Sequence, residues 1–335
     1  MIRKLSIIGL AGVAIAAAGC GSSSSSGTSS GTSPSSTATP GKHYSVTFIA
    51  GTTGDNFYTT LNCGAKQEAA KLGMTYSYTG ASTWGAPQQI PYVQSVTAAH
   101  PDAVLIAPTD VTALIAPMQS MEQAGIKIAE VDTDITNGVE SGVAITSISS
   151  NNLLGGQEAA DALAKLINDK GTVMVINVTA GISTTDARQQ GFTQEMAAKY
   201  PNITVLPTQF DNDSATTAAS ILESTYAANP GLNGIFAANV LTAEGVSTGI
   251  THVGATGTIK DVSFDAEPTD IAALKSGSID ALIAQEPATE GIDGVEQVYD
   301  ALTGKQVTAS IATGLVTITA ANQASMSKYF YVSSC

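Results

Sequence analysis

Short runs of apolar and β-branched residues alternate with longer segments in which apolar residues recur every three or four positions. In the first part of the chain the short runs predict strands at residues 45–50, 75–80, 103–107 and 127–131. The longer amphipathic segments predict helices at residues 57–72, 88–99 and 111–124. This order of strands and helices is typical of a parallel sheet with helices on both faces.

The same order begins again near Asn151 and continues toward the end of the chain. We predict helices at residues 153–168, 185–199, 215–228, 243–252, 269–276 and 287–302. We predict strands at residues 172–178, 204–210, 234–238, 261–264 and 279–285. The repetition favours an α/β protein of two similar lobes, each a Rossmann-like, doubly wound parallel sheet. Ligands of such sheets lie beyond the carboxyl ends of the strands, so two facing lobes would enclose a cleft.

The first residues are typical of a secretory signal peptide. Arg3 and Lys4 precede an apolar run at residues 5–18 that is too short to cross a bilayer, and Cys20 follows. The small residues before Cys20 resemble a bacterial lipobox, although Ala17 stands where leucine is preferred. Residues 1–20 therefore predict a lipoprotein signal and acylation of Cys20, which would anchor the exported protein to the outer face of the cell membrane. An ordinary cleavage site that happens to contain a cysteine is the alternative.

Residues 21–42 are almost entirely serine, threonine, glycine and proline. This segment has no apolar periodicity, so we expect a flexible tether between the anchor and the folded part. The folded part is acidic, because the chain has 14 basic and 28 acidic residues and a net charge of −14. Such a surface repels nucleic acid and anionic ligands, which favours a neutral or cationic ligand and argues against a nucleic-acid partner.

Two cysteines remain once Cys20 is assigned to the lipid anchor. In an oxidising compartment Cys63 and Cys335 are expected to form a disulfide, which would tie the last residue to the first predicted helix. Two unpaired thiols are the alternative, because the sequence alone does not give the distance between them.

The sequence offers little support for an enzyme, a cofactor or a metal site. Residues 245–249 match the G-x-S-x-G pattern of serine hydrolases, but they lie inside a predicted helix and not at a strand-to-helix turn. The three histidines are scattered, and no clustered cysteines or acidic residues have metal-ligand spacing. We therefore expect neither enzymatic activity nor a cofactor or metal site.

Several segments carry a family resemblance. They are Asp55-Asn56-Phe57-Tyr58, residues 106–110, 131–133 and 150–156, Ala187-Arg188-Gln189-Gln190-Gly191-Phe192, residues 236–239, Phe264-Asp265 and Ala284-Gln285. Together they cover most of residues 45–316 in the order found in type I periplasmic sugar-binding proteins of ABC transporters, and the chain resembles ribose-binding protein.

This resemblance implies that the chain crosses between the lobes three times, near Ser150, Gln285 and Ala312. The N-terminal lobe would then comprise residues 43–150 and 286–312, and the C-terminal lobe with its tail residues 151–285 and 313–335. It also implies a monomer that closes by hinge rotation around its ligand and presents the closed form to an ABC transporter membrane permease.

Sugar recognition needs planar hydrogen-bonding groups for adjacent hydroxyls and aromatic faces for the C–H surfaces of the ligand. The polar residues that match the family's ligand positions are Asn56, Asp132, Arg188, Asn239, Asp265 and Gln285. Candidate wall residues are Phe57, Tyr58 and Phe264, and Trp84 is a candidate stacking platform after the second predicted strand. Some of the ten could instead be helix caps or turn residues, and Trp84 could be a packed loop residue.

Two departures from the family pattern bear on the ligand. Ribose-binding members carry asparagine in place of Ala107 and arginine in place of Thr133, so this chain lacks two donors that ribose would need. The expected ligand is a small neutral polyhydroxy compound, a sugar or sugar alcohol other than ribose, with a tetritol or pentitol favoured. A sensory receptor that signals to a membrane kinase or chemoreceptor is the alternative to an importer.

Overall fold

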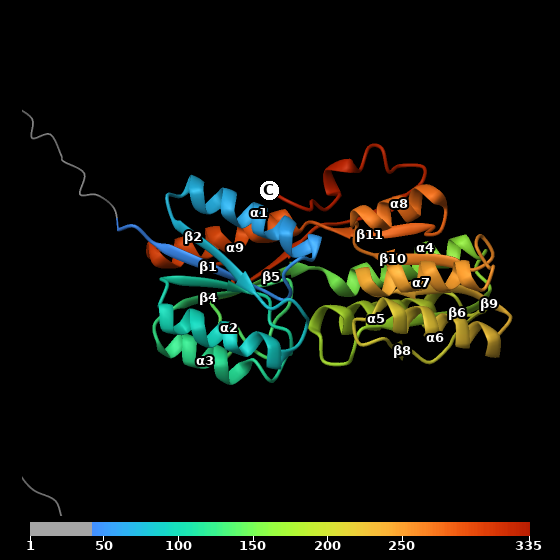
Figure 1. Cartoon of the computed structure of the whole chain (residues 1–335), viewed down its shortest axis with the longest axis horizontal. Coiled ribbons are helices and arrows are strands. Elements are labelled where there is room, and N and C mark those ends of the chain that lie inside the picture. The colour runs from blue at the N-terminus through green and yellow to red at the C-terminus, as the bar shows by residue number, and fades with distance from the viewer. Residues whose placement is uncertain (1–41) are drawn as a thin grey trace, which may run out of the picture. The chain divides into compact units, whose positions relative to one another are not determined.

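A computed structural model describes residues 42–335 of the chain. The predicted signal peptide, Cys20 and nearly all of the predicted tether lie outside the described residues. Within residues 42–335, no helix is both long and apolar enough to span a membrane. These residues form one compact unit built around two β-sheets (Figure 1).

The N-terminal lobe is built on a six-stranded sheet in which all neighbouring strands are parallel. In the order in which they pair, the strands are β12 (Ser310–Thr313), β5 (Thr146–Ser150), β4 (Lys127–Val131), β3 (Ala103–Ile106), β1 (Ser45–Ala50) and β2 (Thr75–Gly80). The central strands are buried along almost their whole length, as expected for a sheet covered on both faces.

The C-terminal lobe repeats this plan with one antiparallel edge strand, β13. The strands pair in the order β13 (Leu315–Thr319), β11 (Ala281–Gln285), β10 (Lys260–Phe264), β9 (Leu232–Ala237), β6 (Gly171–Asn177) and β7 (Ile203–Val205). The short strand β8 (Gln209–Phe210) also pairs with β6. The single strand predicted at residues 204–210 is therefore wrong: Pro207 lies between β7 and β8 and cannot donate a ladder hydrogen bond.

Helices cover both faces of each sheet, as the sequence pattern predicts (Figure 1). In the N-terminal lobe α1 (Asn56–Lys71) packs on α9 (Pro287–Leu302), and α2 (Ala86–Ala99) packs on α3 (Ile115–Gln123). In the C-terminal lobe α4 (Asn152–Leu166) packs on α5 (Ser183–Lys199), and α6 (Ala215–Ala228), α7 (Val240–His252) and α8 (Pro268–Ser276) pack in sequence. A short 3₁₀ helix at Ser327–Tyr329 lies in the tail.

The chain passes between the two sheets three times. The passages lie between β5 and α4, between β11 and α9, and between β12 and β13. Strands β5, β12 and β13 are absent from the sequence predictions, because each is short and only half-buried, and therefore lacks a continuous apolar run. The prediction of two α/β lobes with three crossings is confirmed.

Alternating side chains along the strands separate the core into layers. In β1, Phe48 packs in the layer beneath α1 and α9, whereas Ile49 packs in the layer beneath α2 and α3. The Phe48 layer continues into the C-terminal lobe, and it includes the contact between Phe57 of α1 and Tyr331 of the tail. A separate layer lies between the C-terminal sheet and the α4–α5 pair.

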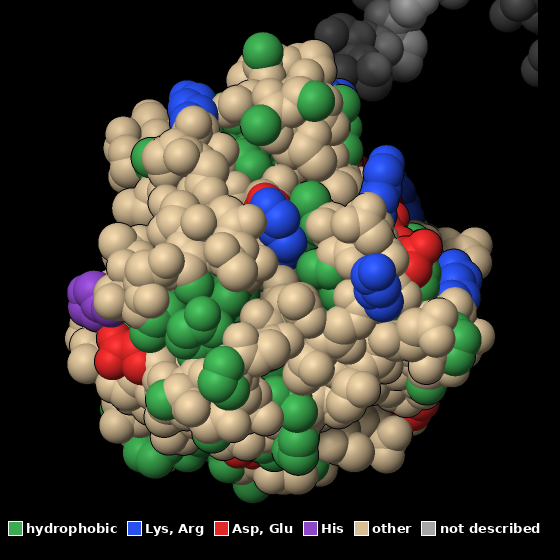
Figure 2. All heavy atoms as spheres, turned by 90° about the vertical axis from the view of Figure 1, so that its right-hand side faces the viewer, with side chains coloured by type: hydrophobic (Ala, Val, Ile, Leu, Met, Phe, Trp, Pro, Cys, Tyr) green, Lys and Arg blue, Asp and Glu red, His purple; other side chains and the backbone are tan. Residues whose placement is uncertain are grey.

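The surface at the end of the C-terminal lobe is mostly uncharged (Figure 2). Its basic and acidic side chains stand singly or in small groups between polar side chains and backbone. This distribution agrees with the low share of charged residues, 13% of the chain. The disulfide predicted between Cys63 and Cys335 is present, with the two Cα atoms 5.4 Å apart, so the last residue is bonded to α1.

Two glycines allow α4 and α5 to pack in close contact. A Cβ atom on Gly156 would overlap the carbonyl oxygen of Arg188, and one on Gly191 would overlap the carbonyl oxygen of Leu153. The two backbones therefore touch directly, and this contact fixes the height at which Arg188 enters the space between the lobes.

We expect Gly191→Ala to lower the free energy of unfolding by about 1 to 3 kcal/mol, because the added methyl group must push the two helices apart. Urea unfolding of the purified variant measures this change. Gly231→Ala is the matched control, since a Cβ there meets nothing within 4 Å and should change stability by about 0.5 kcal/mol or less. Equal stability of the two variants would contradict the prediction, because it would show that α4 and α5 accommodate a methyl group at residue 191 without loss of stability.

Candidate functional site

A cavity of about 610 Å³ lies between the carboxyl ends of the strands of the two lobes. This volume is in the usual range for small-molecule sites. Eight of the ten ligand residues predicted from the sequence line it: Phe57, Tyr58, Trp84, Asp132, Arg188, Asn239, Asp265 and Gln285. Asn56 and Phe264 do not line it.

Two aspartates occupy equivalent positions in the two lobes. Asp132 directly follows β4 and Asp265 directly follows β10, and their φ angles are 65° and 81°. In each case the amide donates 2.8 Å to a carbonyl oxygen of the neighbouring strand, Ile148 for Asp132 and Ile283 for Asp265. The left-handed backbone turns both carboxylates out of their sheets and into the cavity, a strained conformation that is common at functional sites.

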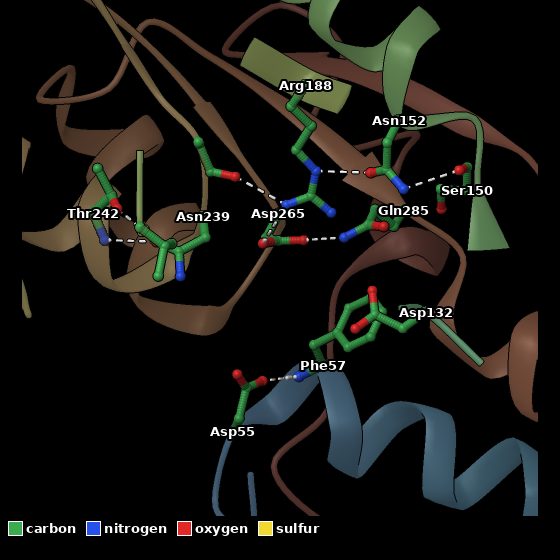
Figure 3. Close-up of polar contacts among 12 residues, drawn as sticks. Asp55, Phe57, Asp132, Ser150, Asn152, Arg188, Asn239, Thr242, Asp265 and Gln285 are labelled. Atoms are coloured by element: carbon green, nitrogen blue, oxygen red, sulfur yellow. Dashed lines mark hydrogen bonds and ion pairs between the residues drawn. The ribbon is translucent and has the colours of Figure 1, made fainter. Parts of the chain in front are cut away.

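Arg188 is the cation of the cavity wall, and its side chain is only 3% exposed. Its Nε donates to Asn152 Oδ1 at 2.7 Å, and its Nη1 donates to the carbonyl oxygen of Ala238 at 2.9 Å. The same Nη1 lies 4.0 Å from Asp265 Oδ2. Figure 3 shows the guanidinium between Asn152 and Asp265. These contacts hold its plane in one orientation.

Phe264 lies behind Arg188 instead of in the cavity. Its ring is fully buried, and the guanidinium carbon of Arg188 stands 3.8 Å from the ring centroid. The sequence analysis named Phe264 as a candidate wall residue within the segment Phe264-Asp265, but it does not line the cavity. Phe264 ends β10 and packs in the layer beneath α4 and α5, with its ring against the guanidinium of Arg188. The left-handed backbone of Asp265 turns the next side chain into the cavity.

Asp55, and not its predicted neighbour Asn56, lines the cavity. Asp55 caps α1 by accepting from the Phe57 amide at 2.7 Å, and it lines the cavity. Asn56 points to the other lobe: its amide donates to Glu267 Oε1 at 2.9 Å and its Nδ2 to Glu267 Oε2 at 3.2 Å. Asn56 and Glu267 thus form a clasp between the lobes, which no pattern in the sequence predicted.

Two further contacts join the lobes at the rim. The Val111 amide donates to the carbonyl oxygen of Gly181 at 3.4 Å. The Asp134 amide donates to Ser183 Oγ at 3.2 Å. With the clasp, these contacts describe a closed arrangement of the lobes around the cavity.

Aromatic rings form the wall of the N-terminal lobe. Phe57 and Tyr58 meet edge to face, and the Tyr58 hydroxyl donates to Asp132 Oδ2 at 2.6 Å. A Cβ on Gly51 would lie 2.5 Å from the Trp84 ring and 2.6 Å from the Tyr58 hydroxyl. Glycine at this strand end therefore lets both rings approach the backbone of β1.

Asn239 and Gln285 are both partly engaged within the protein. Asn239 caps α7 by accepting from the Thr242 amide at 3.0 Å, and its Nδ2 donates to Asp213 Oδ1 at 2.9 Å. Gln285 Nε2 donates to Asp265 Oδ1 at 2.7 Å (Figure 3). Among the described residues, the buried polar atoms of the wall without a protein partner are Gln285 Oε1, Trp84 Nε1 and Thr185 Oγ1.

The comparisons with known proteins agree with this geometry. The family model of the periplasmic binding protein domain matches residues 46–306. The chain belongs to this family of periplasmic binding proteins.

Individual relatives point the same way. The ribose import binding protein of Salmonella typhimurium is 30% identical over 267 residues, which are 79% of this chain and 87% of that protein. A solute binding protein of an ABC transporter from Agrobacterium vitis, solved with α-D-tagatopyranose, is 42% identical with a TM-score of 0.84 and covers 86% of this chain and 99% of its own. A carbohydrate transporter solute binding protein from Agrobacterium radiobacter, solved with D-arabinose, is 27% identical with a TM-score of 0.81 and covers 86% and 99%.

The cavity of this periplasmic binding protein is rich in carboxyl groups. Besides Asp132 and Asp265, its wall includes Asp55, Asp213, Glu244 and Glu267. Burial, with the nearby carboxylates of Glu267 and Asp265, raises the pKa of Asp55 well above its usual range. Burial also raises the pKa of Glu267, against the lowering effect of the Asn56 amide. Both carboxyl groups therefore bind a proton more readily than isolated carboxyl groups do.

Another buried carboxyl group lies where the chain passes between the lobes. Glu290 on α9 is fully buried, and its Oε1 accepts from Ser150 Oγ and from Thr313 Oγ1, each at 3.0 Å. Ser150 ends β5 and Thr313 ends β12. Burial and the charge of Asp132 raise the pKa of Glu290 well above its usual range. Through its hydrogen bonds to Ser150 and Thr313, Glu290 joins two of the three crossings.

We expect the unliganded protein to become more stable as the pH falls from 6 to 4. Burial raises the pKa of Asp132 to about 6, above the 3.8 expected of an ordinary aspartate, so the folded state binds more protons than the unfolded chain in this window. Asp132→Asn, which tolerates the left-handed backbone, should flatten the profile there by about 2 kcal/mol. Chemical denaturation at a series of pH values measures the change.

Glu130→Gln is the matched control for this prediction. Glu130 is buried outside the cavity wall, and burial raises its pKa from 4.5 to about 8. Its substitution should flatten the stability profile mainly between pH 5 and 8 and leave the change between pH 4 and 5 in place. An unchanged profile in Asp132→Asn would contradict the raised pKa of Asp132.

Proposed function

We propose that this protein captures a neutral sugar or sugar alcohol outside the cytoplasm by closing its two lobes, and delivers the ligand to an ABC importer. The observation that carries the proposal is the cavity between the lobes, in which polar and aromatic residues from both sheets meet. Membership of the periplasmic binding protein family and the names of the relatives support it.

The chemistry of the wall suits a polyhydroxy ligand. Asp132 and Asp265 accept hydrogen bonds from hydroxyl groups, and Arg188 donates to hydroxyl oxygens. The unpaired atoms Trp84 Nε1 and Gln285 Oε1 add one donor and one acceptor. The rings of Phe57 and Trp84 supply apolar faces for the C–H groups of a sugar.

The two positions that depart from the ribose pattern contribute no hydrogen-bond donor to the cavity. Ala107 has no polar side-chain atom, and Thr133 Oγ1 donates to the carbonyl oxygen of Pro108 at 2.7 Å. Neither residue lines the cavity. We therefore propose a ligand other than ribose, and we keep a tetritol or pentitol as our sequence-based prediction beside the pentoses and hexoses.

The proposal also covers the residues before residue 42 and the transporter to which the ligand is delivered. We propose that acylated Cys20 anchors the protein to the outer face of the cell membrane, that residues 21–42 tether it, and that it acts as a monomer. The closed lobes would present the ligand to the membrane permease of the transporter. A purely sensory role is not favoured, because the ribose relative is an import protein.

A thermal-shift screen of residues 42–335 tests the proposed function. The panel contains pentoses, hexoses, tetritols, pentitols, amino acids and nucleosides, and a ligand that binds only the folded state raises the melting temperature. We expect a clear shift with one or a few sugars or sugar alcohols. A shift with amino acids or nucleosides alone would overturn the ligand class and keep the fold.

We expect Arg188→Ala and Asp265→Ala each to weaken binding of the identified ligand by about 2 to 4 kcal/mol. Each substitution removes a buried contact and leaves the other charge without its neighbour. Isothermal titration calorimetry measures the affinity, with Lys199→Ala as a control at an exposed cation distant from the cavity wall. Wild-type affinity in either variant would exclude that residue from the site.

A further inference from the structure

The C-terminal strap, residues 320–335, follows β13 and lies beyond the region that the family model matches, residues 46–306. It starts on the C-terminal lobe and ends on α1 of the N-terminal lobe. Figure 1 shows it in red, with the C-terminus beside α1. The strap therefore touches both lobes without being one of the three crossings.

On the C-terminal lobe the strap is held through Tyr331, which is 4% exposed. The Tyr331 hydroxyl donates to Asp265 Oδ1 at 3.0 Å and accepts from the backbone N–H of Gln285 at 3.1 Å. The Tyr331 amide donates to the carbonyl oxygen of Ala266 at 3.1 Å. Tyr331 is not part of the cavity wall, so it contacts two wall residues from outside the cavity.

On the N-terminal lobe the strap makes four contacts, all with α1, of which the weakest is the hydrogen bond from Asn62 Nδ2 to Cys335 Sγ at 3.8 Å. The Tyr331 ring meets the Phe57 ring at 5.7 Å between centroids and 73° between planes. The Val332 amide donates to Thr60 Oγ1 at 2.8 Å. Cys335 is bonded to Cys63. The first turn of the same helix carries Phe57 and Tyr58, both wall residues of the cavity.

We propose that Tyr331 is a positioning residue of the sugar site, and that the disulfide-bonded strap holds it in place across the two lobes. Asp265 Oδ1 receives two donors, Gln285 Nε2 and the Tyr331 hydroxyl. With Oδ1 occupied, Asp265 Oδ2 is the oxygen directed toward Arg188 and the ligand. Loss of the tyrosine hydroxyl removes one of the two donors to Asp265 Oδ1. It also removes the acceptor for the backbone N–H of Gln285. This role rests on the proposed function of the cavity.

The disulfide gives the strap a fixed end. The bond closes a loop of the chain over a sequence separation of 272 residues. Because Tyr331 lies only four residues before Cys335, the bond keeps it near both Phe57 and Asp265 when the lobes close. The strap thus connects the wall residues at the start of α1 to those at the ends of β10 and β11.

Tyr331→Phe tests the proposal, because it keeps the ring against Phe57 and removes only the hydroxyl. In the unliganded protein we expect faster hydrogen exchange of the Gln285 amide, measured by NMR. We also expect about 3- to 10-fold weaker binding of D-tagatose, measured by calorimetry. Tyr329→Phe is the matched control: it lies in the same strap, and its hydroxyl has no hydrogen bond among the described residues. It should match the wild type in both measurements.

A second variant, Cys63→Ser with Cys335→Ser, tests the fixed end while leaving Tyr331 intact. We expect faster exchange at Gln285 and weaker D-tagatose binding here too, with smaller effects than in Tyr331→Phe. Wild-type exchange and affinity in Tyr331→Phe would overturn the positioning role, and wild-type behaviour in the serine variant would overturn the role of the disulfide. If D-tagatose does not bind the wild type, that ligand is excluded, and exchange at Gln285 alone decides the proposal.

Discussion

A guanidinium can remain buried only if its donors and its charge are satisfied, and the cavity wall of the C-terminal lobe is organised around this requirement at Arg188. The guanidinium of Arg188 is contacted by Asn152, by the Ala238 carbonyl and by the Phe264 ring. The side of the guanidinium that these groups leave open faces Asp265 and the cavity. The close packing of α4 on α5 sets the depth of the arginine, because Gly156 leaves no gap beneath its backbone. A ligand therefore meets a charge that is already oriented.

The same interactions link the site to the places where the lobes join. Asn152, which orients Arg188, also donates to the carbonyl oxygen of Ser150, the last residue before the first crossing. Ser150 in turn bonds to Glu290. Side chains of the cavity wall and side chains at the crossings thus belong to one continuous polar network. Asn152 thus connects the guanidinium of Arg188 to the backbone at the first crossing.

The two lobes use one structural device twice. Each places an aspartate in left-handed conformation directly after a central strand, and each pairs its amide with the next strand. The surroundings differ: the Tyr58 hydroxyl is the partner of Asp132, whereas Gln285 and the tail residue Tyr331 are the partners of Asp265. The repeated backbone defines where carboxylates enter the cavity, and the different partners define which oxygen atoms remain for a ligand.

Much of the fold and of the site followed from the sequence. Hydrophobic periodicity predicted most helices and central strands, because these elements bury one face or both and so show a local pattern. Eight cavity residues were predicted because seven of them lie in segments that resemble the sugar-binding family, and Trp84 follows the second predicted strand. The pattern missed β5, β12 and β13, whose half-buried residues lack a continuous apolar run.

Only the tertiary structure decided which lobe a side chain faces. Asn56 and Asp55 are adjacent in the sequence, yet Asn56 bonds to Glu267 of the other lobe and Asp55 lines the cavity. Phe264 and Asp265 are likewise adjacent, yet Phe264 is buried in the core and Asp265 lines the cavity. Tyr331 reaches Asp265 across a sequence separation of 66 residues. The sequence by itself determined the elements and their chemistry, since these depend on neighbouring residues. The hydrogen-bond partner of each side chain depended on contacts between segments far apart in the chain, and no local sequence pattern encodes such contacts.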